Sequence, residues 1–251
     1  MALFEVRGLT KRFLGVTAVG GVDLHVEAGE LVSLIGPNGS GKTTLFNCVT
    51  GYLAPDEGHV TFRGRDVTGV ATHRMARLGI GRTFQLVSVF PRLSALENLL
   101  TFLQQHQEES VVARLVRAPR VRRYEAVAVE RAMMLLDSVG LGARIDTPAG
   151  HLSYGQRKLL TFAAALMPDP ELVLLDEPAA AVNPTMINQM KEQIRGLHRQ
   201  GKAVLLVEHN MDVVMDISQR IIVLDHGQKI AEGPPEAIRR DPKVIEAYFG
   251  V

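Results

Sequence analysis

The chain has 251 residues, and 46% of them are hydrophobic, which is enough to bury a full core and argues against disorder. Its 28 Lys and Arg residues nearly balance its 27 Asp and Glu residues, so the net charge does not favour a nucleic-acid partner. The single cysteine, Cys48, excludes a disulfide framework and a thiolate metal site. No apolar stretch approaches the roughly 20 residues that span a bilayer, and the first residues lack a secretory signal. We therefore expect a cytosolic protein that attaches to a membrane only through a partner.

Strands are predicted for the N-terminal part of the chain. Apolar and polar residues alternate over residues 4–7 and 22–26, which predicts half-buried strands. Residues 31–35 are an apolar run typical of a buried strand, and a further short strand is expected at 59–62.

A glycine-rich loop, residues 36–43, connects the buried strand to a helix expected over residues 43–50. Glycines allow backbone N–H groups to surround a phosphate, and the positive end of the helix points at the same anion. Lys42 supplies a charge for the β- and γ-phosphates, and Thr43 offers a hydroxyl to the accompanying Mg²⁺. The pattern predicts binding of ATP or GTP. The expected nucleotide contacts are Gly36, Pro37, Asn38, Gly39, Ser40, Gly41, Lys42, Thr43 and Thr44.

The middle of the chain is predicted to be mainly helical, from about residue 86 to about residue 160. Ser94 and Glu97 have the spacing of a capping box, helical periodicity covers residues 126–139, and a third helix follows Ser153. Residues 104–125 are rich in arginine, and we expect exposed helix ends and a solvated connection there rather than an anion site. This segment interrupts an α/β core.

Strands and helices alternate again after the helical segment. We expect strands at residues 172–175 and 203–207, and a helix between them with Asn183 as its cap and Pro184 at its first position. A hairpin and a final helix are expected over residues 220–251.

Two acidic residues follow the predicted strand 172–175, at the edge where open α/β sheets bind ligands. Asp176 is expected to hold Mg²⁺, directly or through water, and Glu177 to polarise an attacking water. His209 follows the next apolar strand and could sense the γ-phosphate. Gln85 lies between the core and the helical segment, where its amide could ligate Mg²⁺ or the attacking water.

The motifs occur in a specific order. The phosphate loop is followed by Gln85, the segment Leu152-Ser153-Tyr154-Gly155-Gln156, the pair Asp176-Glu177, and His209. This ordered set resembles the ATP-binding cassette (ABC) proteins over essentially the full chain. The resemblance implies a phosphate-loop ATPase core with an antiparallel β subdomain and a helical subdomain, and a head-to-tail dimer that encloses two ATP molecules.

The same resemblance implies roles for individual residues. Ser153, Gly155 and Gln156 of one subunit would face the phosphate loop of the other subunit across the γ-phosphate. Glu177 would be the catalytic base, Gln85 the link to a transmembrane partner, and His209 the switch histidine. Phe13 would stack on adenine, with an ordinary aromatic at a strand end as the alternative.

Finer features narrow the resemblance. Residues 82–85, 176–184, 207–211 and 245–250 are similar to the ATP-binding subunits of branched-chain amino acid importers, and the urea and amide importers share much of this pattern. The chain departs from many cassettes in having Asn183 in place of an aspartate. It also has Ala181 and Val182 where the importer group usually has glycine and leucine, which affects the expected coupling across the dimer.

The leading hypothesis is an importer ATPase on the inner face of the membrane. Its implied partners are a second cassette, identical or related, separate permease subunits and, indirectly, a secreted substrate-binding protein. The alternative is a soluble cassette ATPase acting on ribosomes or DNA, although such proteins usually carry two cassettes or long coiled-coil insertions. A GTPase is disfavoured because the chain lacks a guanine-reading element, and a small-molecule kinase would leave Ser153 and its neighbours without a purpose.

Overall fold

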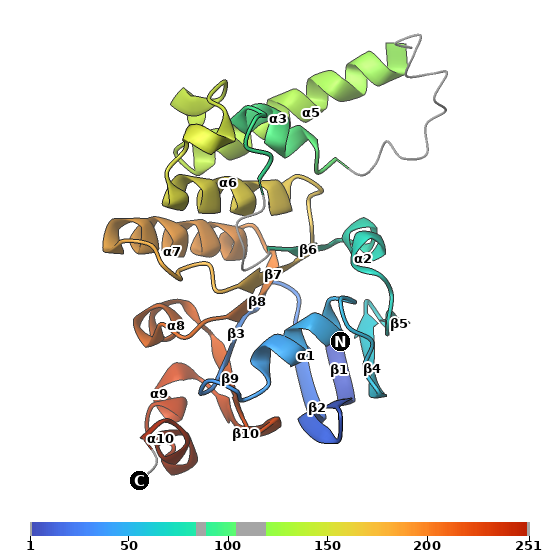
Figure 1. The fold of residues 1–251 in the computed structure, drawn as a ribbon, viewed down its shortest axis with the longest axis vertical. Coiled ribbons are helices and arrows are strands. Elements are labelled where there is room, and N and C mark those ends of the chain that lie inside the picture. Colours follow the sequence, from blue (N-terminus) through green and yellow to red (C-terminus); the bar gives the residue numbers. More distant parts are fainter. Residues whose placement is uncertain (1, 84–88, 104–118, 250–251) are drawn as a thin grey trace.

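The computed structural model describes residues 2–83, 89–103 and 119–249. In these residues the chain forms two sheets and a layer of stacked helices (Figure 1). The smaller sheet is antiparallel and has the strand order β2-β1-β4-β5. Its strands are β1 (Phe4–Phe13), β2 (Val16–Val26), β4 (Glu57–Phe62) and β5 (Arg65–Asp66).

The central sheet has six strands in the order β10-β9-β3-β8-β7-β6. Every described pair is parallel except β9 with β10, which form an antiparallel hairpin. The strands are β3 (Leu31–Ile35), β6 (Ile80–Arg82), β7 (Leu172–Asp176), β8 (Ala203–Val207), β9 (Arg220–Asp225) and β10 (Gln228–Gly233). This mixed α/β architecture agrees with the predicted fold class.

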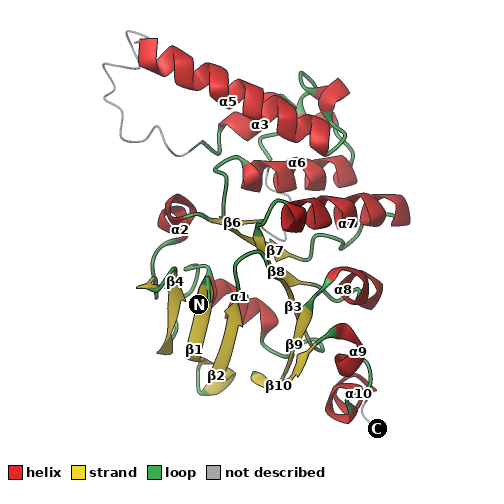
Figure 2. Ribbon diagram, turned by 180° about the vertical axis from the view of Figure 1, so that it is seen from behind, coloured by secondary structure: helices red, strands yellow, loops and turns green. Residues whose placement is uncertain are grey.

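Helices α3, α5 and α6 stack together at the end of the molecule away from the antiparallel sheet (Figure 2). The α-helices are α1 (Lys42–Val49), α2 (Thr72–Leu78), α3 (Ala95–Leu100), α5 (Pro119–Ser138), α6 (Tyr154–Leu166), α7 (Pro184–Arg199), α8 (Met211–Ile217), α9 (Pro235–Ile238) and α10 (Pro242–Phe249). Short 3₁₀ turns at Gly142–Arg144 and Ala149–His151 connect α5 to α6. Within the described residues, no helix is both long and apolar enough to cross a membrane.

Side-chain caps form three helix starts, and those at Ser94 and Asn183 were predicted. Ser94 and Glu97 make a reciprocal capping box at α3, and Ser153 and Gln156 make another at α6, where only the helix start was expected. The Asn183 side chain accepts from the backbone N–H of Met186 at the start of α7.

Helix α2 and strand β6 are among the elements that were not predicted. Helix α2 escapes notice because only Met75 of its residues is buried, which leaves a weak apolar periodicity. Strand β6 has three residues and includes Gly81, so neither its length nor its composition indicates a strand. Its position at the edge of the central sheet nevertheless places Arg82 next to β7.

Hydrophobic cores cover both faces of the central sheet. Alternate residues of its strands face opposite sides. Val173 and Leu175 face a core shared with α6 and α7, whereas Leu172 and Leu174 face a core shared with α1 and the antiparallel sheet. Cys48 of α1 is 1% exposed in the second core, where burial raises the pKa of its thiol to about 11. It is therefore an inert packing residue.

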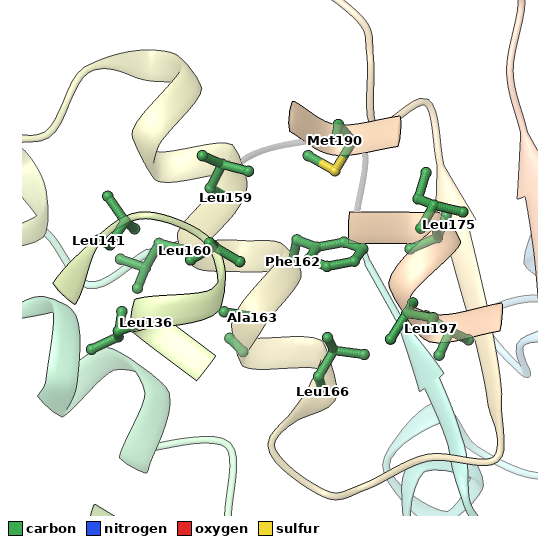
Figure 3. Close-up of a cluster of buried hydrophobic side chains, with 14 of the residues drawn as sticks. Leu136, Leu141, Leu159, Leu160, Phe162, Ala163, Leu166, Leu175, Met190 and Leu197 are labelled. Carbon is green, nitrogen blue, oxygen red and sulfur yellow. The ribbon is translucent and has the colours of Figure 1, made fainter. Parts of the chain in front are cut away.

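Phe162 of α6 lies in the first core, where Met190, Leu175 and Leu197 surround the outer part of its ring (Figure 3). We expect Phe162→Ala to lower the free energy of unfolding by about 3–5 kcal/mol, because it removes buried surface and leaves a cavity between α6 and the sheet. Chemical denaturation monitored by circular dichroism measures this loss. The exposed Met134→Ala is the control and should change stability by less than about 0.5 kcal/mol.

Candidate nucleotide site

Polar residues follow four parallel strands of the central sheet at their carboxyl ends. Strand β3 leads into the phosphate loop, residues 36–43, and β7 ends at Asp176. Strand β8 leads to Glu208 and His209, and its Val207 pairs with Asp176 in the ladder. Strand β6 leads to Thr83, whose Oγ1 accepts from the Asp176 backbone N–H at 3.2 Å. The parallel register thus gathers these groups at one edge of the sheet, the usual ligand-binding edge.

The phosphate loop is packed so closely that glycine is required at its ends. A Cβ at Gly36 would lie 2.1 Å from the carbonyl oxygen of Leu224, and one at Gly41 would lie 2.4 Å from that of Ala18. Gly41 also adopts the left-handed conformation, with φ of 97°, immediately before α1. The loop therefore has the close backbone approach and the helix N-terminus that suit a phosphate.

Lys42 is buried inside the phosphate loop. Its Nζ donates to the carbonyl oxygens of Gly36 and Pro37 at 2.7 and 2.8 Å, and to Ser40 Oγ at 3.3 Å. Burial lowers the pKa of Lys42, and the negative charge of Glu177 partly opposes this shift. The ammonium is thus held where phosphate oxygens could take over its hydrogen bonds.

Asp176, at the end of β7, and Thr43, at the end of the phosphate loop, carry oxygen atoms that could bind a metal ion. Asp176 is 5% exposed, and its Oδ2 lies 3.5 Å from Arg82 Nη2. Burial raises the pKa of Asp176, with the Arg82 charge acting in the opposite direction. The described residues contain no cluster of three or more His, Cys, Asp or Glu side chains that could hold a metal. A carboxylate and a hydroxyl fit Mg²⁺, which keeps several waters and needs few protein ligands.

Glu177 and His209 lie next to each other at the edge of the site. Glu177 Oε1 is 3.7 Å from His209 Nδ1. Glu177 has a φ of 46°, an unusual left-handed conformation for a non-glycine residue, and its N–H donates to the carbonyl of Val207 at 2.9 Å. The turn directs the side chain out of the strand and toward His209.

Three residues that the sequence analysis did not single out complete this environment. Glu208 is buried behind His209, Lys158 of α6 is 7% exposed, and the Arg82 guanidinium stacks 4.9 Å from the ring centroid of Phe46. The sequence did offer a signal for these residues, because each is a charged residue next to an apolar strand or on the apolar face of a helix. Charged groups are rarely buried without partners, so such positions indicate a specific interaction.

The remaining predicted residues are placed on other elements. Phe13 is 44% exposed at the end of β1, with Lys11 Nζ 5.6 Å from its ring centroid. Ser153 is exposed at the start of α6. Because α1 and α6 pack on opposite faces of the central sheet, the structure does not bring Ser153 and Lys42 of one chain into one site. Gln85 lies outside the described residues.

The side chains of Ser153 and Gln156 stabilise the start of α6, and Gly155 allows α6 to pack closely against α7. The Ser153 Oγ accepts from the backbone N–H of Gln156 at 3.2 Å, and Gln156 Oε1 accepts from that of Ser153 at 2.9 Å. Gly155 packs against Met186, whose Cε would lie 2.8 Å from an added Cβ. The segment presents an exposed helix N-terminus with a hydroxyl.

Ala181 provides a test of strain near the site. It has a φ of 58°. We expect Ala181→Gly to raise the free energy of unfolding by about 0.5–1 kcal/mol, because the relief of left-handed strain exceeds the entropy that glycine adds to the unfolded chain. Chemical denaturation measures the change. Ala180→Gly, which has no such strain to relieve, is the control and should be destabilising by about 0.5–1 kcal/mol.

The comparisons with known families match two parts of the chain. Residues 19–180 match the model described as ABC transporter, and residues 228–251 match the model described as branched-chain amino acid ATP-binding cassette transporter. The high-affinity branched-chain amino acid transport ATP-binding protein BraF of Pseudomonas aeruginosa is 44% identical over 249 residues, which cover 99% of this chain and 98% of the relative.

Solved structures agree with these matches. The ADP conformation of an ATP-binding cassette of an ABC transporter superposes with a TM-score of 0.86 and 35% identity, covering 100% of both chains. A dimeric post-hydrolysis cassette bound to ADP and Pi superposes with a TM-score of 0.77 and 26% identity, covering 92% of this chain and 98% of the other. These matches confirm the resemblance inferred from the ordered motifs: the chain belongs to the ABC transporter family and is a nucleotide-binding cassette of that family.

Proposed function

We propose that this chain is the ATP-binding and ATP-hydrolysing subunit of an importer for branched-chain amino acids. The observation that carries the proposal is the gathering of the phosphate loop, Asp176, Glu177 and His209 at one edge of the central sheet. The match of residues 228–251 to the branched-chain family and the 44% identity to BraF support this choice of cargo class over urea or an amide.

Binding of ATP is assigned to the phosphate loop. Its backbone N–H groups and the N-terminus of α1 receive the phosphates, and Lys42 exchanges its bonds to loop carbonyls for bonds to phosphate oxygens. Thr43 and Asp176 are the proposed protein ligands of Mg²⁺, which when bound neutralises charge on the phosphates. Phe13, exposed at the end of β1, is the proposed adenine platform.

Hydrolysis is assigned to Glu177 and His209. The Glu177 carboxylate orients a water and accepts its proton as the oxygen attacks the γ-phosphorus and the bond to the β-phosphate oxygen breaks. His209, 3.7 Å from Glu177, donates a hydrogen bond to the transferring phosphate. Gln85 is proposed as a further ligand of the metal or of the water.

A second cassette is needed to complete each site. Lys42 and Ser153 lie on opposite faces of the central sheet, so one chain cannot use both on one phosphate. A head-to-tail pair places Ser153, Gly155 and Gln156 of one subunit opposite the phosphate loop of the other, where a helix N-terminus adds a second anion site.

A hollow of about 540 Å³ is the proposed contact for a cytoplasmic segment of a permease subunit. It lies where α2 and β6 meet α6, and Tyr52, Arg82 and Phe102 are among the residues that line it. Because Arg82 also lies 3.5 Å from Asp176, a partner seated there could influence the nucleotide site. A contact with the permease at this hollow would hold the chain on the inner face of the membrane.

Glu177→Gln tests the assignment of the base. We expect turnover to fall by about 10²–10⁴-fold, because the amide cannot accept the proton, while the dissociation constant for ATP changes by less than about twofold. Phosphate release and fluorescent-nucleotide titration measure the two quantities. Glu171→Gln, at the opposite end of β7, is the matched control and should hydrolyse ATP normally. Normal turnover in Glu177→Gln would rule out its role as the base.

Reconstitution tests the transport assignment. The chain should co-purify in detergent with the permease subunits of its importer. In proteoliposomes, we expect their binding protein loaded with leucine, isoleucine or valine to stimulate ATP hydrolysis several-fold, because cargo delivery must be coupled to cassette closure. Stimulation by urea or a short amide instead would change the cargo class. Isolation only with ribosomes or DNA would favour the non-transport cassette.

A further inference from the structure

Two buried side chains of opposite charge enclose the turn that follows β7. Glu208 comes from the loop after β8, and its side chain is fully buried. Lys158 comes from α6 and is 7% exposed. Between them runs the base loop, residues 177–181, which begins with Glu177. Such burial of two charged groups is costly unless each is fully hydrogen-bonded.

Glu208 receives three backbone N–H groups. Its Oε1 accepts from Ala179 at 2.8 Å, and its Oε2 accepts from His209 and Asn210 at 2.9 and 3.1 Å. One carboxylate therefore holds both the middle of the base loop and the backbone that carries His209. The two segments that supply Glu177 and His209 are fixed to each other through this group.

Lys158 holds the same loop from the other side. Its Nζ donates to the carbonyl oxygens of Glu177 and Ala180 at 3.0 and 2.5 Å, with that of Pro178 at 3.4 Å. Burial lowers the pKa of Lys158, and the negative charges of Glu208 and Glu177 oppose this shift. The ammonium therefore donates to carbonyl oxygens near both ends of the turn.

The base loop needs such support because its backbone is strained at both ends. Glu177 and Ala181 have φ values of 46° and 58°, and left-handed conformations of non-glycine residues persist only where their surroundings enforce them. Within the loop, the Ala180 N–H donates to the Glu177 carbonyl, and the Glu177 N–H donates to Val207 of β8. Lys158 and Glu208 add further hydrogen bonds to this backbone.

We infer that Lys158 and Glu208 form a clamp that positions Glu177 against His209 and ties both to α6, an inference that rests on the proposed role of Glu177. Neither clamp residue touches the reacting atoms; both are positioning residues. Because Ser153 caps the N-terminus of α6 and Lys158 lies on the same helix, the clamp also connects the surface offered to the partner's nucleotide with the base of the chain's own site.

The test measures turnover and ATP affinity separately. We expect Lys158→Met and Glu208→Gln each to lower kcat by about 10–100-fold, because small misplacements of a reacting group cost rates of this order. The dissociation constant for ATP should stay within about twofold, since the phosphate loop is untouched. Lys191→Met, which removes an α7 ammonium that pairs with Asp216 of α8, is the matched control and should turn over normally.

A double-mutant cycle and a conservative variant separate positioning from general destabilisation. The kcat of the double variant should be only slightly lower than that of the less active single variant, because both groups hold the same loop. Lys158→Arg, which keeps the charge and several donors, should restore most of the rate. Losses that multiply, a parallel loss of ATP affinity, or a kcat decrease smaller than about fivefold would each overturn the clamp.

Hydrogen exchange gives a readout that does not depend on ATP hydrolysis. The amides of Glu177 and Ala179 should exchange at least about tenfold faster in Lys158→Met than in the unmodified chain, because the base loop loses its donors. If Lys158→Met does not fold, Lys158→Gln replaces it in all measurements. An unmodified chain without ATPase activity refutes the proposed function, whereas unchanged exchange and turnover in the variant refute the clamp alone.

Discussion

Backbone hydrogen bonds between β3, β7 and β8 hold the ends of three strands level at one edge of the central sheet. Leu34 and Asp176 both pair with Val207. The start of the phosphate loop, the acidic pair and His209 therefore all lie at the same level, where these strands end. A one-residue slip of β7 would exchange its two faces and carry Asp176 away from Arg82. The buried residues on both faces of β7 fix the register and therefore also the site.

The chemistry of the site depends on what happens just after those strands end. A parallel strand places a residue at the edge of the sheet but does not fix the direction of its side chain. After β7, the left-handed backbone of Glu177 sets that direction, and this strained turn requires hydrogen-bond donors and acceptors from outside the strand. Lys158 and Glu208 supply them from a helix and from the next loop, which explains why two charged groups are tolerated in a dry interior.

Much of this arrangement could be predicted from the sequence because its signals are local. The phosphate loop, the capping box at Ser94, and the helix starts at Ser153 and Asn183-Pro184 each depend on a few adjacent residues, and the structure forms all of them. The order of the motifs identified the family, which the comparisons confirm. The roles of Glu177, His209 and Gln85 stay predictions.

What the sequence could not provide were contacts between distant segments. Lys158 and Glu208 are separated by a strand, a long helix and another strand, and no local pattern links them. Arg82 gave no signal as a partner of Asp176, because β6 is too short and too poor in apolar residues to be recognised as a strand. The burial of these charges depends on tertiary packing, which overrides local preference.

The packing of α1 and α6 on opposite faces of the central sheet has a mechanical consequence. Helix α1, which follows the phosphate loop, packs on one face of the central sheet, and α6, which starts at Ser153, packs on the other. A nucleotide on the first face therefore cannot contact the α6 N-terminus of its own chain. If Glu177 acts on the nucleotide as proposed, the nucleotide can influence that helix, because Lys158 binds the carbonyls of the base loop from within α6. If the sheet is rigid, the base loop is a covalent and hydrogen-bonded route from the nucleotide edge to α6. A displacement of Glu177 at one nucleotide would then move the surface that contacts the other.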